Sequence, residues 1–258
     1  MLAIERRNLI FEMLQRDKRV VVSELSAMFN VSEETIRRDL EKLSEDGSVT
    51  KTYGGAVLNE ENYNDMPFII RKDTNVAEKQ IIGKLIAEIV QDGEKIMVDA
   101  STTSVFAGRY LKARKDITII TNSVGLLLEM SDVPSFHVIS TGGNLRGDTL
   151  SFTGNQVDKV FSSYVVDTAI FSCKGIETEA GATDSNEVNA YIKRSILGAA
   201  KRKILAVDHT KFGKTALVRI CNLGELTHIV TDVKPSDEWL SYLAAHGIAC
   251  VYPKKDAE

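Results

Sequence analysis

The chain has few cysteines, no long apolar run and no surplus of basic residues, and each absence excludes a class of protein. Its three cysteines are odd in number, widely spaced and set in apolar sequence, which predicts reduced, buried thiols rather than disulfides or a zinc site. No segment approaches the roughly 18 uninterrupted apolar residues of a membrane span. The charged N-terminal segment lacks a secretory hydrophobic region. We therefore expect a cytoplasmic protein without a membrane partner.

The charge balance also limits how the protein can bind nucleic acid. The formal net charge is −4, and even residues 1–55 match their lysines and arginines with carboxylates. A surface of this kind does not favour nonspecific binding to a polyanion. Any affinity for DNA must come from a few cations placed together on one face. The 258 residues, 43% of them hydrophobic, are enough for a sizeable core and favour two domains.

Residues 22–54 predict two short amphipathic helices around a tight turn at residues 29–31. Ser32 is a candidate N-cap of the second helix, and its first turn is acidic, as the helix dipole favours. That helix has one apolar stripe, formed by Ile36, Leu40 and Leu43, and carries Thr35, Arg37 and Arg38 on another side. One face can pack while the other reaches the DNA major groove. The alternative is an ordinary helical hairpin whose charged face is solvated.

Flanking segments favour the DNA-binding interpretation. An amphipathic helix at residues 4–14 supplies Ile4, Leu9, Ile10, Met13 and Leu14, enough to complete a three-helix core, and residues 49–53 alternate as in a small β-wing. We predict a winged helix-turn-helix domain at residues 1–57 and a polar linker at residues 58–73. An α/β domain follows at residues 74–258, where strand-like and helix-like stretches alternate, implying a mostly parallel sheet. The predicted strands are 95–98, 117–121, 137–140, 168–172, 204–207 and 229–231.

The loops after these strands carry the polar residues of the second domain. Ligands bind beyond the carboxyl ends of strands in an open α/β sheet. Hydroxyls and N–H groups at a helix start suit phosphate, and the carboxylates suit hydroxyl groups. Glu187 can reach this cleft from a helix start, whereas Lys193 is equally well explained as a solvated charge. We predict a small phosphorylated, polyhydroxylated ligand, held by residues on five loops: Asp99, Ser101, Thr102, Thr103, Asn122, Gly142, Gly143, Arg146, Lys174, Asp208 and Lys211.

Two sets of motifs resemble the DeoR family of bacterial transcription regulators. The first is Thr35–Leu40, reading TIRRDL, followed by Gly54-Gly55-Ala56; the second is the series of polar loops after the predicted strands. Tyr53 and Lys51 stand where the family usually has His and Arg, and Ser101 where it commonly has Gly. The resemblance implies an α/β sensor domain related to sugar-phosphate isomerases, a phosphorylated-sugar effector and regulation of a carbohydrate operon, most simply by repression. It implies DNA contacts from Ser32, Glu34, Thr35, Arg37, Arg38, Lys42, Lys51 and Tyr53.

Two other functions remain open. An enzyme that isomerises sugar phosphates would need a base beside the substrate carbon and an acid near its oxygen, but no carboxylate–histidine arrangement is recognised and no catalytic residue is assigned. No metal-ligand spacing or cofactor motif is present either, so we expect neither. A pure oligomerisation domain is the third alternative. A homo-oligomer, dimer or tetramer, is expected in any case, because paired half-sites on a double-stranded operator add specificity.

Overall fold

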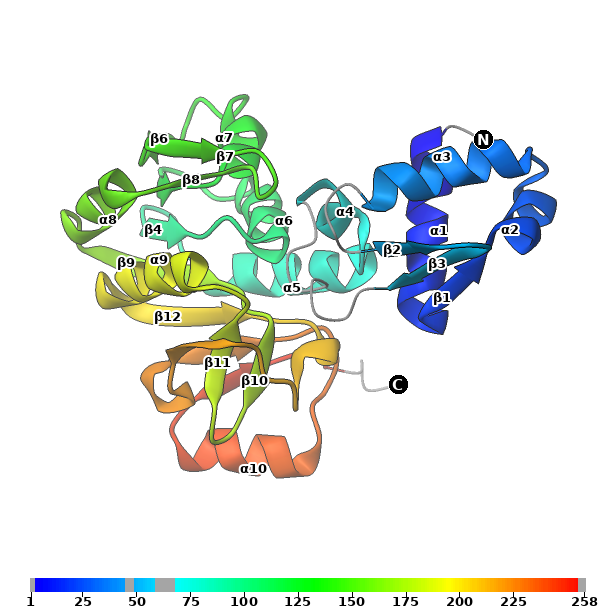
Figure 1. Cartoon of the computed structure of the whole chain (residues 1–258). Coiled ribbons are helices and arrows are strands. Elements are labelled where there is room, and N and C mark those ends of the chain that lie inside the picture. The colour runs from blue at the N-terminus through cyan, green and yellow to red at the C-terminus, as the bar shows by residue number, and fades with distance from the viewer. Residues whose placement is uncertain (1–2, 45–48, 59–67, 255–258) are drawn as a thin grey trace. The chain divides into compact units, whose positions relative to one another are not determined.

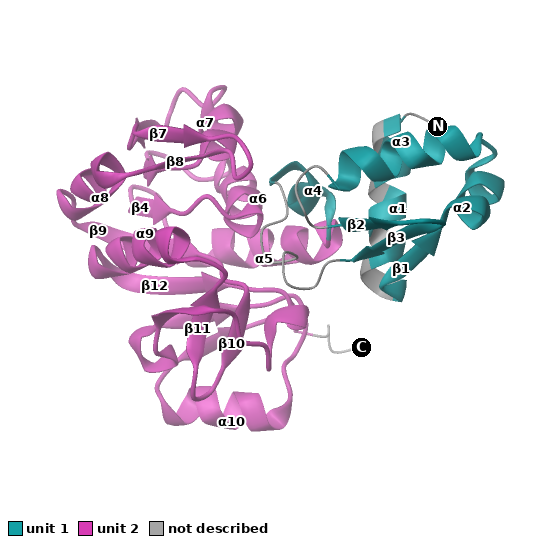
Figure 2. Ribbon diagram, viewed as in Figure 1, with its two compact units in different colours: residues 1–74 teal, residues 75–258 magenta. Residues whose placement is uncertain are grey.

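A computed structural model describes residues 3–44, 49–58 and 68–254 of the chain. These belong to two compact units, Met1–Thr74 and Asn75–Glu258 (Figure 2). Within the segment predicted as a linker, Leu58 is the last residue of a strand and Phe68–Asp73 form a short helix, α4, while residues 59–67 lie outside the described ranges. None of the helices in the described ranges has the length and apolar character needed to cross a membrane.

Unit 1 contains the predicted helices and wing. The helices are α1 (Ala3–Asp17), α2 (Val22–Phe29) and α3 (Glu33–Ser44), and the strands are β1 (Arg19–Val21), β2 (Val49–Thr52) and β3 (Gly55–Leu58), in the antiparallel order β1-β3-β2 (Figure 1). β1 was not predicted and adds a third strand to the wing. The core gathers Ile10, Phe11, Leu14, Leu25, Ile36, Leu40 and Leu43 with strand residues.

The core-facing stripe of α1 differs from the predicted one. Leu9 is 40% exposed, whereas Ile10, Phe11 and Leu14 are almost fully buried. Successive residues are displaced by about 100° around a helix, so Leu9 points away from the face that Ile10 and Leu14 share. Phe11 supplies the volume that Leu9 was expected to fill. The side chain of Ile4 lies outside the described part of the chain.

Gly55 is required by the close approach of β3 to β1. A Cβ added at this position would lie 1.9 Å from the carbonyl oxygen of Val20, a contact with backbone that no side-chain movement can relieve. We expect Gly55→Ala to lower the free energy of unfolding of unit 1 by about 1 kcal/mol or more through overpacking. Chemical denaturation followed by circular dichroism would measure this. Gly54→Ala is the matched control, because a Cβ there meets nothing within 4 Å; equal stability of the two variants would contradict the prediction.

In the described part of unit 2, seven parallel strands form one sheet in the order β15-β14-β12-β9-β4-β5-β6. The carboxyl-terminal halves of the central strands β4, β9 and β12 are buried and apolar, as expected for a sheet covered on both faces. Five of the predicted strands begin or end within two residues of the observed ones; β12 begins four residues earlier. The strands are β4 (Lys95–Val98), β5 (Thr118–Thr121), β6 (His137–Ser140), β9 (Val166–Phe171), β12 (Ala200–Ala206), β14 (His228–Val230) and β15 (Ala249–Val251).

Helices connect the parallel strands, as predicted. α5 packs against α6 and α6 against α7, while α8 packs against α9. Their bounds are α5 (Val76–Ile89), α6 (Thr102–Leu111), α7 (Val124–Met130), α8 (Asn155–Ser162), α9 (Glu187–Gly198) and α10 (Asp237–Ala245). Two short 3-10 turns, η2 (His209–Lys211) and η3 (Leu223–Glu225), follow β12 and β13.

Two smaller sheets were not predicted. β7 (Asn144–Arg146) and β8 (Ser151–Thr153) form a hairpin, and β10 (Gly175–Glu177), β11 (Gly181–Asp184) and β13 (Val218–Cys221) form an antiparallel sheet. Their strands have three or four residues and contain glycine or polar residues, so neither an apolar run nor a clear alternation marks them in the sequence. β11 leads directly to α9 and so brings Asp184 to the start of that helix.

Candidate functional site

The start of α3 is fixed by the predicted N-cap. The Ser32 hydroxyl accepts a hydrogen bond from the backbone N–H of Thr35 at 3.2 Å and lies 2.9 Å from the Thr35 hydroxyl. This satisfies one of the N–H groups that a helix start leaves without an intrahelical acceptor. Both residues predicted to approach DNA from this end of α3 are therefore also engaged in holding its first turn.

Asp39 joins α3 to α1 through a buried ion pair. Its carboxylate accepts a hydrogen bond from Arg6 Nε at 2.6 Å and lies 3.7 Å from Arg7 Nη1, and both Arg6 and Asp39 are buried. From sequence these residues counted only as opposed charges. Two of the cations near the N-terminus are thus committed to internal pairing, so the DNA-binding face depends on other residues.

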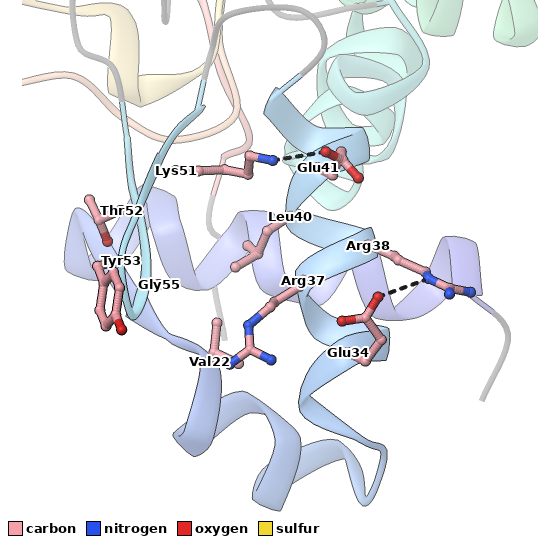
Figure 3. A pocket seen from close by; sticks show the side chains of 10 residues that line it. All are labelled: Val22, Glu34, Arg37, Arg38, Leu40, Glu41, Lys51, Thr52, Tyr53 and Gly55. Carbon is pink, nitrogen blue, oxygen red and sulfur yellow. Dashed lines mark hydrogen bonds and ion pairs between the residues drawn. The ribbon is translucent and has the colours of Figure 1, made fainter.

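Arg37 and Arg38 lie on the exposed side of α3, each beside a glutamate one turn earlier. Arg37 donates to Glu33 at 2.7 Å and Arg38 to Glu34 at 3.3 Å, and the arginine side chains are 54% and 77% exposed. Figure 3 shows Arg37 extending toward Val22 and Arg38 extending to the other side of the helix with Glu34. Exposed pairs of this spacing contribute only about 0.3–0.5 kcal/mol, so phosphate or a base edge can displace the glutamates.

A groove separates α3 from the wing. Lys51 on β2 donates to Glu41 of α3 at 2.9 Å, and this hydrogen bond holds the pKa of Glu41 below its usual range. Tyr53 lies fully exposed in the β2–β3 turn (Figure 3), and Lys42 is exposed on α3. Nine of the ten residues around this groove belong to α3, to β2 and β3 or to the turn between them. Its lining residues are Val22, Glu34, Arg37, Arg38, Leu40, Glu41, Lys51, Thr52, Tyr53 and Gly55.

In unit 2, the carboxyl ends of adjacent parallel strands bring polar residues to one edge of the sheet. β4 lies between β5 and β9, with Val98 in register with Thr121 and Ile170. Asp99 and Asn122 follow β4 and β5, and Asp208 follows β12, which pairs with the other side of β9. All three side chains are at least 97% buried. The sheet topology therefore groups the residues that follow β4, β5, β9 and β12.

The loop after β4 caps α6. Ser101 donates a hydrogen bond to Asp99 Oδ1 at 2.7 Å, and its oxygen accepts one from the Ser104 N–H at 3.2 Å. Thr102 and Thr103 are buried in the first turn. Because the first N–H groups of a helix have no intrahelical acceptor, this turn presents backbone donors suited to an anion. Ser101 itself is used within the loop.

Lys193 is buried at this edge rather than solvated. Its ammonium donates to Asp184 Oδ2 and lies 3.5 Å from Asp99 Oδ2, and its side chain is 10% exposed. Burial alone would lower the pKa of Lys193, but the negative charges of Asp184 and Asp99 have the larger combined effect and raise it. Burial alone would raise the pKa of Asp184, but the charge and hydrogen bond of Lys193 lower it. Glu187, predicted to enter the cleft from the same helix, is exposed.

The remaining predicted residues are divided between this edge and the loops beside it. Asp208 accepts a hydrogen bond from the Thr210 N–H at 3.0 Å; burial opposes its charge, but Lys211 and Thr210 lower its pKa. Lys174 is half-buried, and its positive charge helps to lower the pKa of Asp184. Arg146 instead pairs with Asp148, two residues away, at 2.5 Å. Gly142 and Gly143 have positive φ, 58° and 112°, in the loop between β6 and β7.

The loop after β12 contains a histidine–carboxylate pair that was not predicted. His209 Nδ1 lies 2.7 Å from Asp232 Oδ2, and the His209 N–H donates to Asp232 Oδ1 at 2.7 Å. The hydrogen bond to Asp232 raises the pKa of the half-exposed His209. Within the described ranges, no three His, Cys, Asp or Glu residues are grouped so as to hold a metal ion.

The His209–Asp232 pair predicts a pH-dependent stability of unit 2. A histidine whose folded pKa is raised stabilises the fold fully below its unfolded pKa of about 6.5, and this contribution is lost as pH rises through the folded pKa. We expect the melting temperature to fall across that window, and His209→Gln to remove that part of the dependence. Calorimetry at a series of pH values would measure it. His246→Gln is the control; an unchanged pH profile of His209→Gln would contradict the assignment.

Comparisons with known proteins match both units. The model of the DeoR-like helix-turn-helix domain matches residues 6–62, and that of the DeoR C terminal sensor domain matches residues 74–233. An uncharacterized HTH-type transcriptional regulator, YulB of Bacillus subtilis, is 37% identical over 90% of each chain. The HTH-type transcriptional repressor GlcR of the same species is 32% identical over 98% of this chain and 97% of its own. The glycerol-3-phosphate regulon repressor of Escherichia coli is 29% identical over 95% and 96%.

Solved structures show weaker similarity. Ribose 5-phosphate isomerase A from Methanocaldococcus jannaschii is 15% identical, with a TM-score of 0.39 over 52% of this chain and 53% of that one. The delta subunit of eIF2B from Chaetomium thermophilum is 11% identical, with a TM-score of 0.44 over 65% and 60%.

Proposed function

The chain belongs to the DeoR family of transcriptional regulators, and on that premise we propose that it represses a carbohydrate-metabolism operon and leaves its operator when a phosphorylated sugar or related catabolite binds unit 2. The observation that carries this proposal is the exposed face of α3, where Arg37 and Arg38 project beside the groove to the wing. Its cations are held only by weak pairs with glutamates, and such cations can exchange those partners for DNA.

We assign the two DNA-contacting roles by position. Residues of α3, namely Glu34, Thr35, Arg37, Arg38 and Lys42, would enter or border the major groove, with Ser32 at the helix start. Arginine can bind a guanine edge with two hydrogen bonds, and glutamate can accept one from cytosine. Lys51 and Tyr53 of the wing would contact the DNA backbone. Phosphate contacts position the protein, so sequence would be read mainly by α3.

We assign the effector to the carboxyl edge of the sheet in unit 2. The first turn of α6, at Thr102 and Thr103, would bind the phosphate through backbone N–H groups. Asp99, Asn122 and Asp208 would accept hydrogen bonds from sugar hydroxyls, and Lys211 and Lys174 would balance charge. Arg146, Gly142, Gly143 and Glu187 would then lie at the rim. The relative in Escherichia coli that represses the glycerol-3-phosphate regulon supports an effector of this class.

We further propose that the protein is cytoplasmic, has no catalytic activity and acts as a homo-oligomer, with a DNA-binding domain at residues 1–57, a linker at 58–73 and a sensor domain at 74–258. Regulators that match nearly the whole chain favour sensing over catalysis. An α/β domain that serves only in oligomerisation would give no response to any sugar phosphate. Turnover of a sugar phosphate by the purified protein would instead support an isomerase-like enzyme fused to a DNA-binding domain.

A gel-shift experiment tests the proposal directly. The probe is the DNA upstream of the protein's own gene, titrated with protein in the presence and absence of a panel of sugar phosphates. We expect a specific complex that at least one member of the panel dissociates at constant salt, because salt alone changes affinity for DNA. No specific complex would refute the DNA-binding role. A complex that no member of the panel affects would refute the effector role.

A further inference from the structure

Three charged side chains from distant parts of unit 2 meet at the carboxyl edge of its sheet. Lys193 of α9 hydrogen-bonds Asp184 of β11, and its ammonium is 3.5 Å from Oδ2 of Asp99, which follows β4. The side chains of the two aspartates are 1–2% exposed. Two buried carboxylates share this one buried ammonium, and the half-buried Lys174 also acts on Asp184. Cys173, another titratable neighbour of Lys193, stays neutral because burial raises its pKa to about 12.

The two carboxylates are used differently. Asp184 takes the hydrogen bond from Lys193 and another from the N–H of Ser185. Asp99 Oδ1 accepts from Ser101, but among the described residues Asp99 Oδ2 has no hydrogen-bond donor. Asn122 follows the neighbouring strand, and among the described residues its Oδ1 also has no hydrogen-bond donor. Its amide nitrogen donates to the Phe152 carbonyl at 3.0 Å. Buried acceptors are almost always hydrogen-bonded in native proteins, so two at adjacent strand ends indicate a ligand that donates.

We propose that Lys193 is a positioning residue of the effector site, holding Asp99 as an ionised acceptor for hydroxyl groups at the end of the effector remote from its phosphate. The inference rests on the proposed effector function and specifies its chemistry. Asp184 keeps the ammonium hydrogen-bonded on its own side, so Lys193 stabilises the charge of Asp99 without occupying Oδ2. Asn122 Oδ1 accepts from a second hydroxyl. The site therefore selects a polyhydroxylated phosphate over inorganic phosphate.

The first test is Asp99→Asn in the full-length protein. This variant leaves Lys193 and Asp184 as a one-to-one pair and keeps an oxygen that can accept from Ser101, so we expect it to fold. The probes are inorganic phosphate, glycerol 3-phosphate and a set of hexose phosphates, measured by calorimetry and thermal shift. We expect a loss of at least about tenfold in affinity for the hexose phosphate that binds the natural protein, because a charged acceptor is lost. Binding of inorganic phosphate and the melting temperature without ligand should not fall.

The second test is Lys193→Gln, with Lys193→Arg as the conservative variant. Without the ammonium, the buried carboxylate pair has no cation to share, and burial together with like charge favours a proton held within the pair. Affinity for the hexose phosphate, expressed relative to the natural protein at each pH, should be reduced near neutrality and recover as the pH is raised. The ratio cancels titration of the ligand phosphate. Lys174 and Lys211 remain in both proteins, and Lys193→Arg should retain most of the affinity.

The outcomes separate the inference from the function on which it rests. Lys159→Gln, an exposed charge on α8, is the control for loss of a lysine. Hexose-phosphate affinity unchanged in Asp99→Asn, or equal losses for inorganic and hexose phosphate, would overturn the inference while leaving the effector function standing. If Lys193→Gln does not fold, the affinities of Asp99→Asn still test the inference. If no probe binds the natural protein, the proposed effector function fails and the inference fails with it.

Discussion

Replacing Arg37 or Arg38 with alanine is expected to weaken operator binding by about 1–3 kcal/mol if the arginine reads a base with two hydrogen bonds. Each guanidinium is exposed on α3, and each pairs with a glutamate of the preceding turn. If the arginine reads a base, its loss also relaxes the sequence preference at one operator position. If it binds a phosphate, its loss weakens binding to all DNA sequences equally. The slope of log affinity against log salt concentration then falls by about one. Titrations at several salt concentrations would distinguish these cases.

The glutamate partners make a control for the arginine variants necessary. Arg37→Ala leaves Glu33 without its cation beside the DNA, so repulsion of phosphates adds to the loss of the arginine. The double variant Glu33→Gln/Arg37→Ala removes that repulsion. The difference in operator affinity between the single and the double variant measures the contribution of the repulsion. Lys115→Ala, an exposed charge in unit 2, controls for the change in net charge. Unchanged affinity of both single arginine variants would refute the assignment of α3 as the recognition helix.

Replacing Thr102 with tryptophan is expected to abolish the response to the effector while leaving operator binding intact. Thr102 is the first residue of α6 and is 5% exposed. A large side chain there would fill the approach to the N–H groups proposed to bind phosphate. The measurement is the gel shift with and without the active sugar phosphate, together with binding of that compound to the isolated protein.

The control for this variant is Gln156→Trp, which places the same side chain in the first turn of another helix, α8, at an exposed position. It should respond to the effector as the natural protein does. Circular dichroism and melting would show whether Thr102→Trp keeps the fold, since overpacking alone can destabilise. A folded Thr102→Trp protein that still leaves the operator at the same effector concentration would show that the phosphate is bound elsewhere.

Most of the regular elements could be predicted because their signals are local. The apolar stripe of α3 and the acidic first turn after Ser32 lie within twelve consecutive residues, and the structure has that helix and its N-cap as predicted. The long strands of unit 2 were recognised by their apolar runs, and their alternation with helices predicted the parallel sheet. The strands of the two smaller sheets escaped prediction because their three or four residues include glycine or polar residues and form no apolar run. Leu9 was misplaced because its neighbours Ile10 and Phe11 are also apolar.

The sequence by itself determined the kinds of element, their order and the loops that reach the same sheet edge, because periodicity and strand order depend on neighbouring residues. Only the tertiary structure decided which charges are internal. Asp39 pairs with Arg6, 33 residues away, and Lys193 lies between Asp184 and Asp99 from two other strands. A lysine in an amphipathic helix has the same local pattern whether its ammonium meets water or two carboxylates. The chain must fold before burial and Coulombic attraction distinguish the two, since both depend on distances between residues far apart in sequence.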